Sequence, residues 1–161
     1  MITINRALAR QVRAVFRKAL GITSHSLTYP LTLETGPDGL HVRAISPDAA
    51  VEYHQSGDLP AERLRVPFDL LNDCEGRKPE PVQLDPEGDK AVVARWRDGN
   101  VPQIVRCDVP GTPKLGAFPE TTAGLTENPP RILVALHDAA QSTDPGSIRY
   151  ATGCIQLRGG D

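Results

Sequence analysis

The chain has 161 residues, of which 39% are hydrophobic and 24% charged, a composition typical of a globular protein with room for one ordinary domain and some surplus. Eighteen basic and twenty acidic residues give a formal charge of −2, which excludes a polycationic protein. Because the three cysteines are widely spaced and no apolar run approaches membrane-spanning length, we expect a cytoplasmic protein without a disulfide framework and without a membrane partner.

The strongest helix signal lies at residues 6–20. Asn5 is a suitable N-cap, Gly21 is a suitable stop, and no glycine or proline lies between them. At about 100° per residue, an arc of about 100° carries apolar side chains and an arc of about 60° on the opposite side carries arginines. The apolar set is Leu8, Val12, Val15, Phe16 and Ala19, and the arginine set is Arg6, Arg10, Arg13 and Arg17. We therefore expect the apolar set in the core and the arginines in a line on the other face.

Strand patterns follow this helix. Alternating apolar residues predict a hairpin of residues 27–33 and 40–44 around the turn "GPDG". "AAVEYHQSGD" and "ERLRVP" predict a third and a fourth strand, and "PFDLLNDC" is long enough for two helical turns. Residues 81–110 predict three more strands, and residues 1–5 a further edge strand. Because helices and strands are segregated along the chain, the fold class is α+β and not alternating βαβ.

The segment from 110 to 130 is rich in proline, glycine and threonine and predicts a domain boundary. We place the first domain at 1–120 and the beginning of a second at 121–161. The second begins with a helix at 131–143 and a strand at 150–161, which repeats the tyrosine-led strand pattern of the first. Because the last strand ends at a turn with no returning strand, we expect a truncated piece of a longer protein made of repeated domains.

The arginine line is the main functional signal. Residues 1–33 hold five basic residues and no acid, so the remaining chain holds thirteen basic and twenty acidic residues, a formal charge of −7. The four arginines repel one another by about 0.2–0.5 kcal/mol per pair, and their line of about 17 Å suits a nucleic-acid backbone. The alternative is that they are solvated or pair with carboxylates from elsewhere in the chain. Since the seven aromatic residues are scattered, we expect phosphate contacts without sequence preference.

No residue pattern indicates catalysis or a metal site. The histidines His25, His41, His54 and His137 show no metal-ligand spacing among themselves or with the cysteines. No acid, base and nucleophile emerge as a set, and "GPDG" and "RGGD" are turns, not phosphate-binding loops. We therefore expect a non-catalytic protein with no metal and no cofactor.

Four stretches match the pattern of one known family. They are "VPFDLLNDCEG" at 66–76, the closing "VP" at 109–110, "FPE" at 118–120 and, above all, "LVALHDAAQSTDPGSIRYATGCIQL" at 133–157. With these stretches and the order of its elements, the chain resembles the bacterial DNA sliding clamp, the beta subunit of the replicative DNA polymerase III. The resemblance covers the whole chain, as a complete first domain and the opening of a second.

The resemblance implies a clamp domain in which a long and a short helix pack on antiparallel sheets, followed by a partial repeat. Such domains form a head-to-tail homo-oligomeric ring whose helices line a central hole. The ring encircles double-stranded DNA, is placed there by a clamp loader and tethers the replicative DNA polymerase, so it is a processivity factor in DNA replication without catalysis of its own. In such a ring the first helix faces the hole, and the four arginines would contact DNA.

Two features depart from that pattern. The short helix carries Asp69 and Asp73 and no basic residue, with only Arg77 and Lys78 just beyond it. The helix at 131–143 has only Arg131 and His137 as basic residues. These departures favour the alternative of a diverged clamp-fold module that binds protein partners and does not load on DNA.

Overall fold

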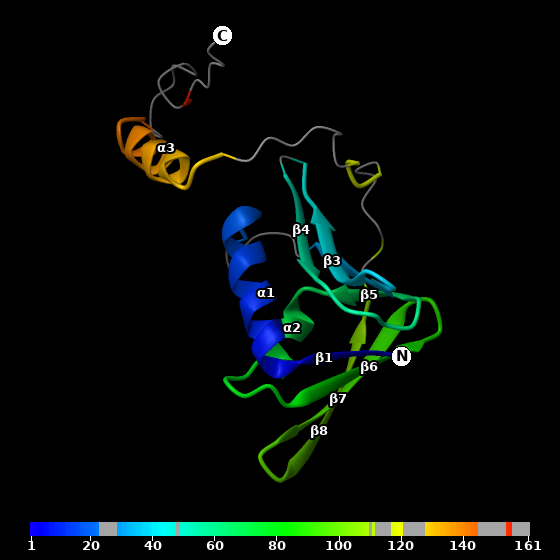
Figure 1. The fold of residues 1–161 in the computed structure, drawn as a ribbon. Helices are drawn as coiled ribbons and strands as arrows, with labels where there is room; N and C mark the ends of the chain where they lie inside the picture. The colour runs from blue at the N-terminus through cyan, green and yellow to red at the C-terminus, as the bar shows by residue number, and fades with distance from the viewer. Residues whose placement is uncertain are drawn as a thin grey trace. The chain divides into compact units, whose positions relative to one another are not determined.

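The computed structural model describes residues 1–22, 29–47, 49–109, 111, 117–120, 128–144 and 154–155. The chain divides into two compact units, Met1–Glu120 and Thr121–Asp161. The first unit combines two antiparallel sheets with two helices and is therefore α+β, as the sequence predicts (Figure 1).

The two sheets of the first unit have four strands each. The first sheet has the order β1 (Ile2–Asn5), β6 (Pro81–Glu87), β7 (Ala91–Asp98) and β8 (Val101–Asp108). The second has the order β4 (Ala50–Gln55), β3 (Gly39–Ile45), β2 (Pro30–Gly36) and β5 (Glu62–Pro67). Helix α1 (Arg6–Ala19) follows β1 directly, and helix α2 (Asp69–Cys74) follows β5 and contacts α1 (Figure 1).

The first unit repeats one arrangement twice along the chain. The elements β1, α1, β2, β3 and β4 form one half, and β5, α2, β6, β7 and β8 form the other in the same order. In each half the three strands after the helix form an antiparallel meander. The strand before the helix instead joins the sheet of the other half, so that β1 pairs with β6 and β5 pairs with β2. Neither half can therefore complete its own sheet alone.

Sequence periodicity predicted the elements of this unit well. The edge strand at the N-terminus, the long helix, the β2–β3 hairpin and the short helix α2 are all confirmed. Residues 23–28, which include the predicted start of β2, lie outside the described residues. The duplication was not predicted, because β1 and β5 pair with strands that are distant in the sequence.

One hydrophobic core joins both sheets and both helices of the first unit. In β2, for example, Leu31 and Leu33 are buried while the intervening Thr32 is only half-buried, as expected for a strand with one face on the core. Trp96 on β7 belongs to the same core. Burial raises the pKa of the Cys74 thiol to about 12, so this side chain is a neutral core residue.

The second unit is described mainly by helix α3 (Arg131–Gln141). Among the described residues, none of its side chains is buried, and Leu133 and Val134 are 69% and 61% exposed. The strand predicted at 150–161 lies outside the described residues except for Cys154 and Ile155, so the repeated domain stays a prediction. None of the helices in the described ranges has both the length and the apolar character needed to cross a membrane.

Gly39, which ends the turn between β2 and β3, offers a test of this packing. Its φ is 121°, and an added Cβ would lie 2.0 Å from the carbonyl oxygen of Gln55. Gly99 also has a positive φ, 61°, but no atom lies within 4 Å of an added Cβ there. We expect Gly39→Ala to lower the free energy of unfolding by more than about 3 kcal/mol, because backbone strain adds to a clash with a paired strand. Gly99→Ala, which adds strain alone, should cost only about 1 kcal/mol.

Urea unfolding followed by the fluorescence of Trp96, which is 8% exposed in the fold, measures both variants. Equal losses for the two alanine variants would contradict the close approach of Gly39 to β4.

Candidate nucleic-acid interface

Asn5 fixes the start of α1 and thereby the direction in which its arginines point. The side-chain oxygen of Asn5 accepts a hydrogen bond from the backbone N–H of Leu8 at 2.7 Å, which is the N-cap that the sequence predicts. The helix ends at Ala19, and Gly21 follows with a φ of 61°, the left-handed conformation that terminates many helices.

The buried side of α1 is rotated from the one that we predicted. The buried residues are Leu8, Ala9, Val12 and Phe16. The prediction that Val15 and Ala19 belong to the core is wrong, since Val15 is 44% exposed and Ala19 is exposed too. At about 100° per residue, exchanging these two for Ala9 moves the centre of the buried face by about 20° towards the arginines. The arginines therefore flank the core instead of lying opposite to it. One of them, Arg6, donates hydrogen bonds to backbone oxygens at the end of α2.

Arg6 is held by the protein itself. Its Nη1 donates to Glu80 Oε2 at 2.8 Å and to Asp98 Oδ1 at 2.9 Å. Its Nε and Nη2 donate to the carbonyl oxygens of Cys74 and Glu75 at the end of α2. The side chain is only 11% exposed. The expectation that Arg6 faces solvent and a DNA backbone is therefore corrected: Arg6 joins α1 to α2, to the start of β6 and to the β7–β8 turn.

The carboxylates around Arg6 stabilise its positive charge. The hydrogen bond to Asp98 raises the pKa of Arg6, and the hydrogen bond to Glu80 adds to this, although partial burial acts in the opposite direction. These carboxylates offset the cost of a cation at the positive end of the helix dipole. An added Cβ at Gly76 would lie 2.8 Å from Nε of Arg6, so only a glycine leaves room for the guanidinium here.

Arg13 is partly engaged. Its Nη1 lies 3.2 Å from Oε1 and 3.1 Å from Oε2 of Glu75, and each of the two side chains is 27% exposed. The alternative that the arginines pair with carboxylates from elsewhere in the chain thus holds for Arg6 and for Arg13. A half-exposed pair of this kind contributes about 1 kcal/mol or less, so an incoming phosphate can compete with Glu75 for Arg13.

Arg10 and Arg17 remain open to solvent. Both are exposed, and neither side chain makes an ion pair or a hydrogen bond among the described residues. Lys18 is exposed and unpaired within the same described part of the chain. It also lies on the solvent side of the helix, about 80–100° around the axis from Arg10 and Arg17. Lys18 is one of the five basic residues counted in 1–33, but it was not placed in the predicted site because it falls outside the regular spacing of the arginines. We call Arg10, Arg17 and Lys18 the basic face of α1; it spans about 12 Å along the axis and carries no acid.

The neighbouring helix α2 has the opposite charge. Asp69 and Asp73 are exposed on α2, which lies beside α1 (Figure 1). Arg77 and Lys78, in the loop that follows α2, are exposed as well. Arg131 and His137 are exposed on α3 in the second unit. The four arginines predicted as a site are therefore divided into two that the fold uses and two that remain on the surface.

This division gives a stability prediction. We expect Arg6→Ala to lower the free energy of unfolding by about 2–4 kcal/mol, because it removes two ion pairs and leaves the carbonyl oxygens at the end of α2 without their donor. Arg10→Ala removes the same charge from the same helix and should change the free energy of unfolding by less than about 0.5 kcal/mol. Urea unfolding of the two variants makes the comparison, and similar values for both would contradict the structural role of Arg6.

Comparisons with known proteins identify no relative: no protein-family model, no curated protein and no solved structure matches this chain. The resemblance to sliding clamps therefore stays a prediction.

Proposed function

We propose that the first unit binds nucleic acid through the basic face of α1, and that the full-length protein is a non-catalytic processivity factor that encircles duplex DNA. The observation that carries this proposal is the exposure of Arg10, Arg17 and Lys18, which make no ion pair among the described residues, on a helix without a single acid. Guanidinium and ammonium groups that the fold does not engage are available to phosphate oxygens.

The fold of the first unit supports the same proposal. The resemblance implies domains whose helices line a hole and whose strands form the wall around it. The two helices of the first unit contact each other, and the strands form two sheets, which is compatible with that arrangement. Tethering a replicative polymerase to DNA is the function of the family that the chain resembles, and it is part of this proposal for that reason.

The strength of the contact can be bounded. Each phosphate neutralised on duplex DNA contributes about −0.9 to the slope of log K against log salt, so the basic face gives a slope of about −2.7 per copy. Recruiting Arg13 away from Glu75 would bring the slope to about −3.6. One copy therefore holds DNA weakly and without sequence preference, and several copies around a duplex are needed for stable retention.

A second candidate is a module that binds protein partners and does not load on DNA. The observation that favours it is the exposed pair of carboxylates on α2, Asp69 and Asp73, beside the helix that carries the basic face. A duplex lying along both helices would meet like charge at α2, which costs binding energy. A folded partner with an acidic and a basic patch would match both helices instead.

Duplex binding by paired variants separates the two candidates. We expect Arg10→Ala/Arg17→Ala to reduce the slope of log K against log salt by about 1.8 and to weaken binding equally for two unrelated sequences. Lys90→Ala/Arg97→Ala is the charge-matched control, because it removes two exposed cations that lie in the β6–β7 turn and near the end of β7 and are not part of α1, and it should leave the slope unchanged.

The measurement is fluorescence anisotropy of short labelled duplexes with the 161-residue chain, across a salt series that begins at low ionic strength. The same slope for both double variants would exclude the basic face as the DNA contact. No duplex binding by the unmodified chain at low salt would favour the second candidate.

A further inference from the structure

The β2–β3–β4 sheet brings together three metal-ligand side chains that the sequence keeps apart. His41 on β3 and His54 on β4 are directly opposite each other in the strand register. Their rings are stacked, with centroids 4.3 Å apart and an angle of 14° between the planes. Asp38, in the turn before β3, places Oδ2 2.8 Å from Nε2 of His41. One ligand atom from each of the three residues lies within 4.8 Å of the other two.

We propose that Asp38, His41 and His54 form a binding site for a divalent transition-metal ion, with Zn²⁺ as the best match. Two imidazoles and one carboxylate are ligands that Zn²⁺ accepts readily, with bonds of about 2.0–2.2 Å and a fourth position left for water. Tetrahedral bonds of this length place ligand atoms about 3.4 Å apart. The ligand atoms found here lie within 4.8 Å of one another, so rotation of the side chains can bring them to that spacing.

His54 is the ligand that has to move most. Its Nε2 lies 2.9 Å from the carbonyl oxygen of Asp38, and its ring stacks on His41 instead of pointing at a shared centre. The side chain of His54 is exposed, so a change of rotamer meets little packing. His41, whose side chain is 16% exposed, is the fixed member of the site.

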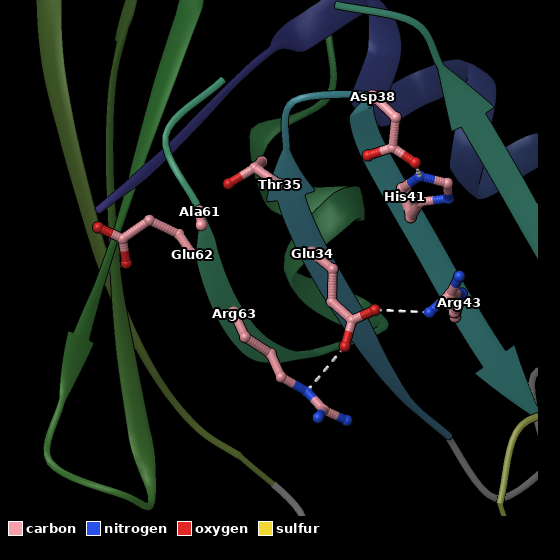
Figure 2. Close-up of a pocket in the computed structure, with 8 residues that line it drawn as sticks. All are labelled: Glu34, Thr35, Asp38, His41, Arg43, Ala61, Glu62 and Arg63. Carbon is pink, nitrogen blue, oxygen red and sulfur yellow. Dashed lines mark hydrogen bonds and ion pairs between the residues drawn. The ribbon is translucent and has the colours of Figure 1, made fainter. Parts of the chain in front are cut away.

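A network of charged side chains fixes the orientation of His41. Its Nδ1 lies 3.3 Å from Oε1 of Glu52, whose other oxygen accepts from Nε of Arg43. Arg43 in turn donates to Glu34 at 2.5 Å, and Figure 2 shows Glu34 between Arg43 and Arg63. Metal-binding histidines commonly donate their second ring N–H to a carboxylate, which fixes the tautomer. Glu52 occupies that position and leaves Nε2 of His41, beside Asp38, as the ligand atom.

The site is accessible to an ion. Asp38 and His41 lie at the edge of an open cleft of about 500 Å³, together with Thr35 and Glu62 (Figure 2). A hydrated ion can therefore reach both ligands from solvent. Once bound, the ion would link the β2–β3 turn to β4. β4 is an edge strand of its sheet, so this link would add a tie to a strand that has a neighbour on one side only.

Titration of the 161-residue chain with Zn²⁺ in an isothermal titration calorimeter tests the site. We expect one equivalent of Zn²⁺ to bind and to raise the melting temperature. His41→Gln and His54→Gln should each weaken binding more than tenfold, and Glu52→Gln should weaken it by about 10–100-fold through the orientation of His41. His137→Gln, which alters an exposed histidine of α3, is the control and should bind like the unmodified chain.

Two further readouts keep the test decisive. Circular dichroism shows that each variant is folded, and the spectrum of the Co²⁺-substituted chain reports whether a cysteine thiolate is a ligand. Nitrogen and oxygen ligation without a thiolate band supports the site. The proposal is overturned by the absence of Zn²⁺ binding up to millimolar concentration, by unchanged binding in both histidine variants, or by a thiolate band.

Discussion

The exchange of first strands between the two halves is the constraint on which the rest of the unit depends. β1 completes the sheet that contains β6, and β5 completes the sheet that contains β2. Arg6, the residue directly after β1, strengthens the exchange with its side chain, because its partners Glu80 and Asp98 both belong to the other half. The position of α1 follows from these ties, and so does the direction in which its basic face points.

The fold and the proposed interface compete for the same arginines. Four were expected to face DNA, but the structure gives one to the junction between the halves and a second to a half-exposed pair with Glu75. What remains on α1 is a smaller surface, which Lys18 enlarges. The acidic α2 lies next to it, so the electrostatic pattern of the two helices is mixed and not uniformly positive. The proposed ring would depend on the number of copies more than on the strength of each contact.

Local signals in the sequence predicted the elements, whereas the site depended on long-range geometry. The N-cap Asn5 and the hairpin turn are encoded within a few residues, and both were found. The rotation of α1 about its own axis was predicted wrongly, because apolar spacing defines only a broad arc. Packing against α2 and the strands decides which part of that arc is buried. The partners of Arg6 are 74 and 92 residues away, and the pairing of His41 with His54 follows from strand register, which no spacing rule reveals.

The burial of Arg6 has a consequence for experiments in salt. Mobile ions screen exposed charges strongly and enclosed charges weakly. The guanidinium of Arg6 is 11% exposed, whereas Arg10 and Arg17 are open to solvent, so raising the ionic strength acts on the basic face long before it acts on the junction between the halves. The same helix thus carries cations that respond strongly to the ionic strength and one that responds weakly, so a salt series separates the surface charges of α1 from the charge that holds the two halves together.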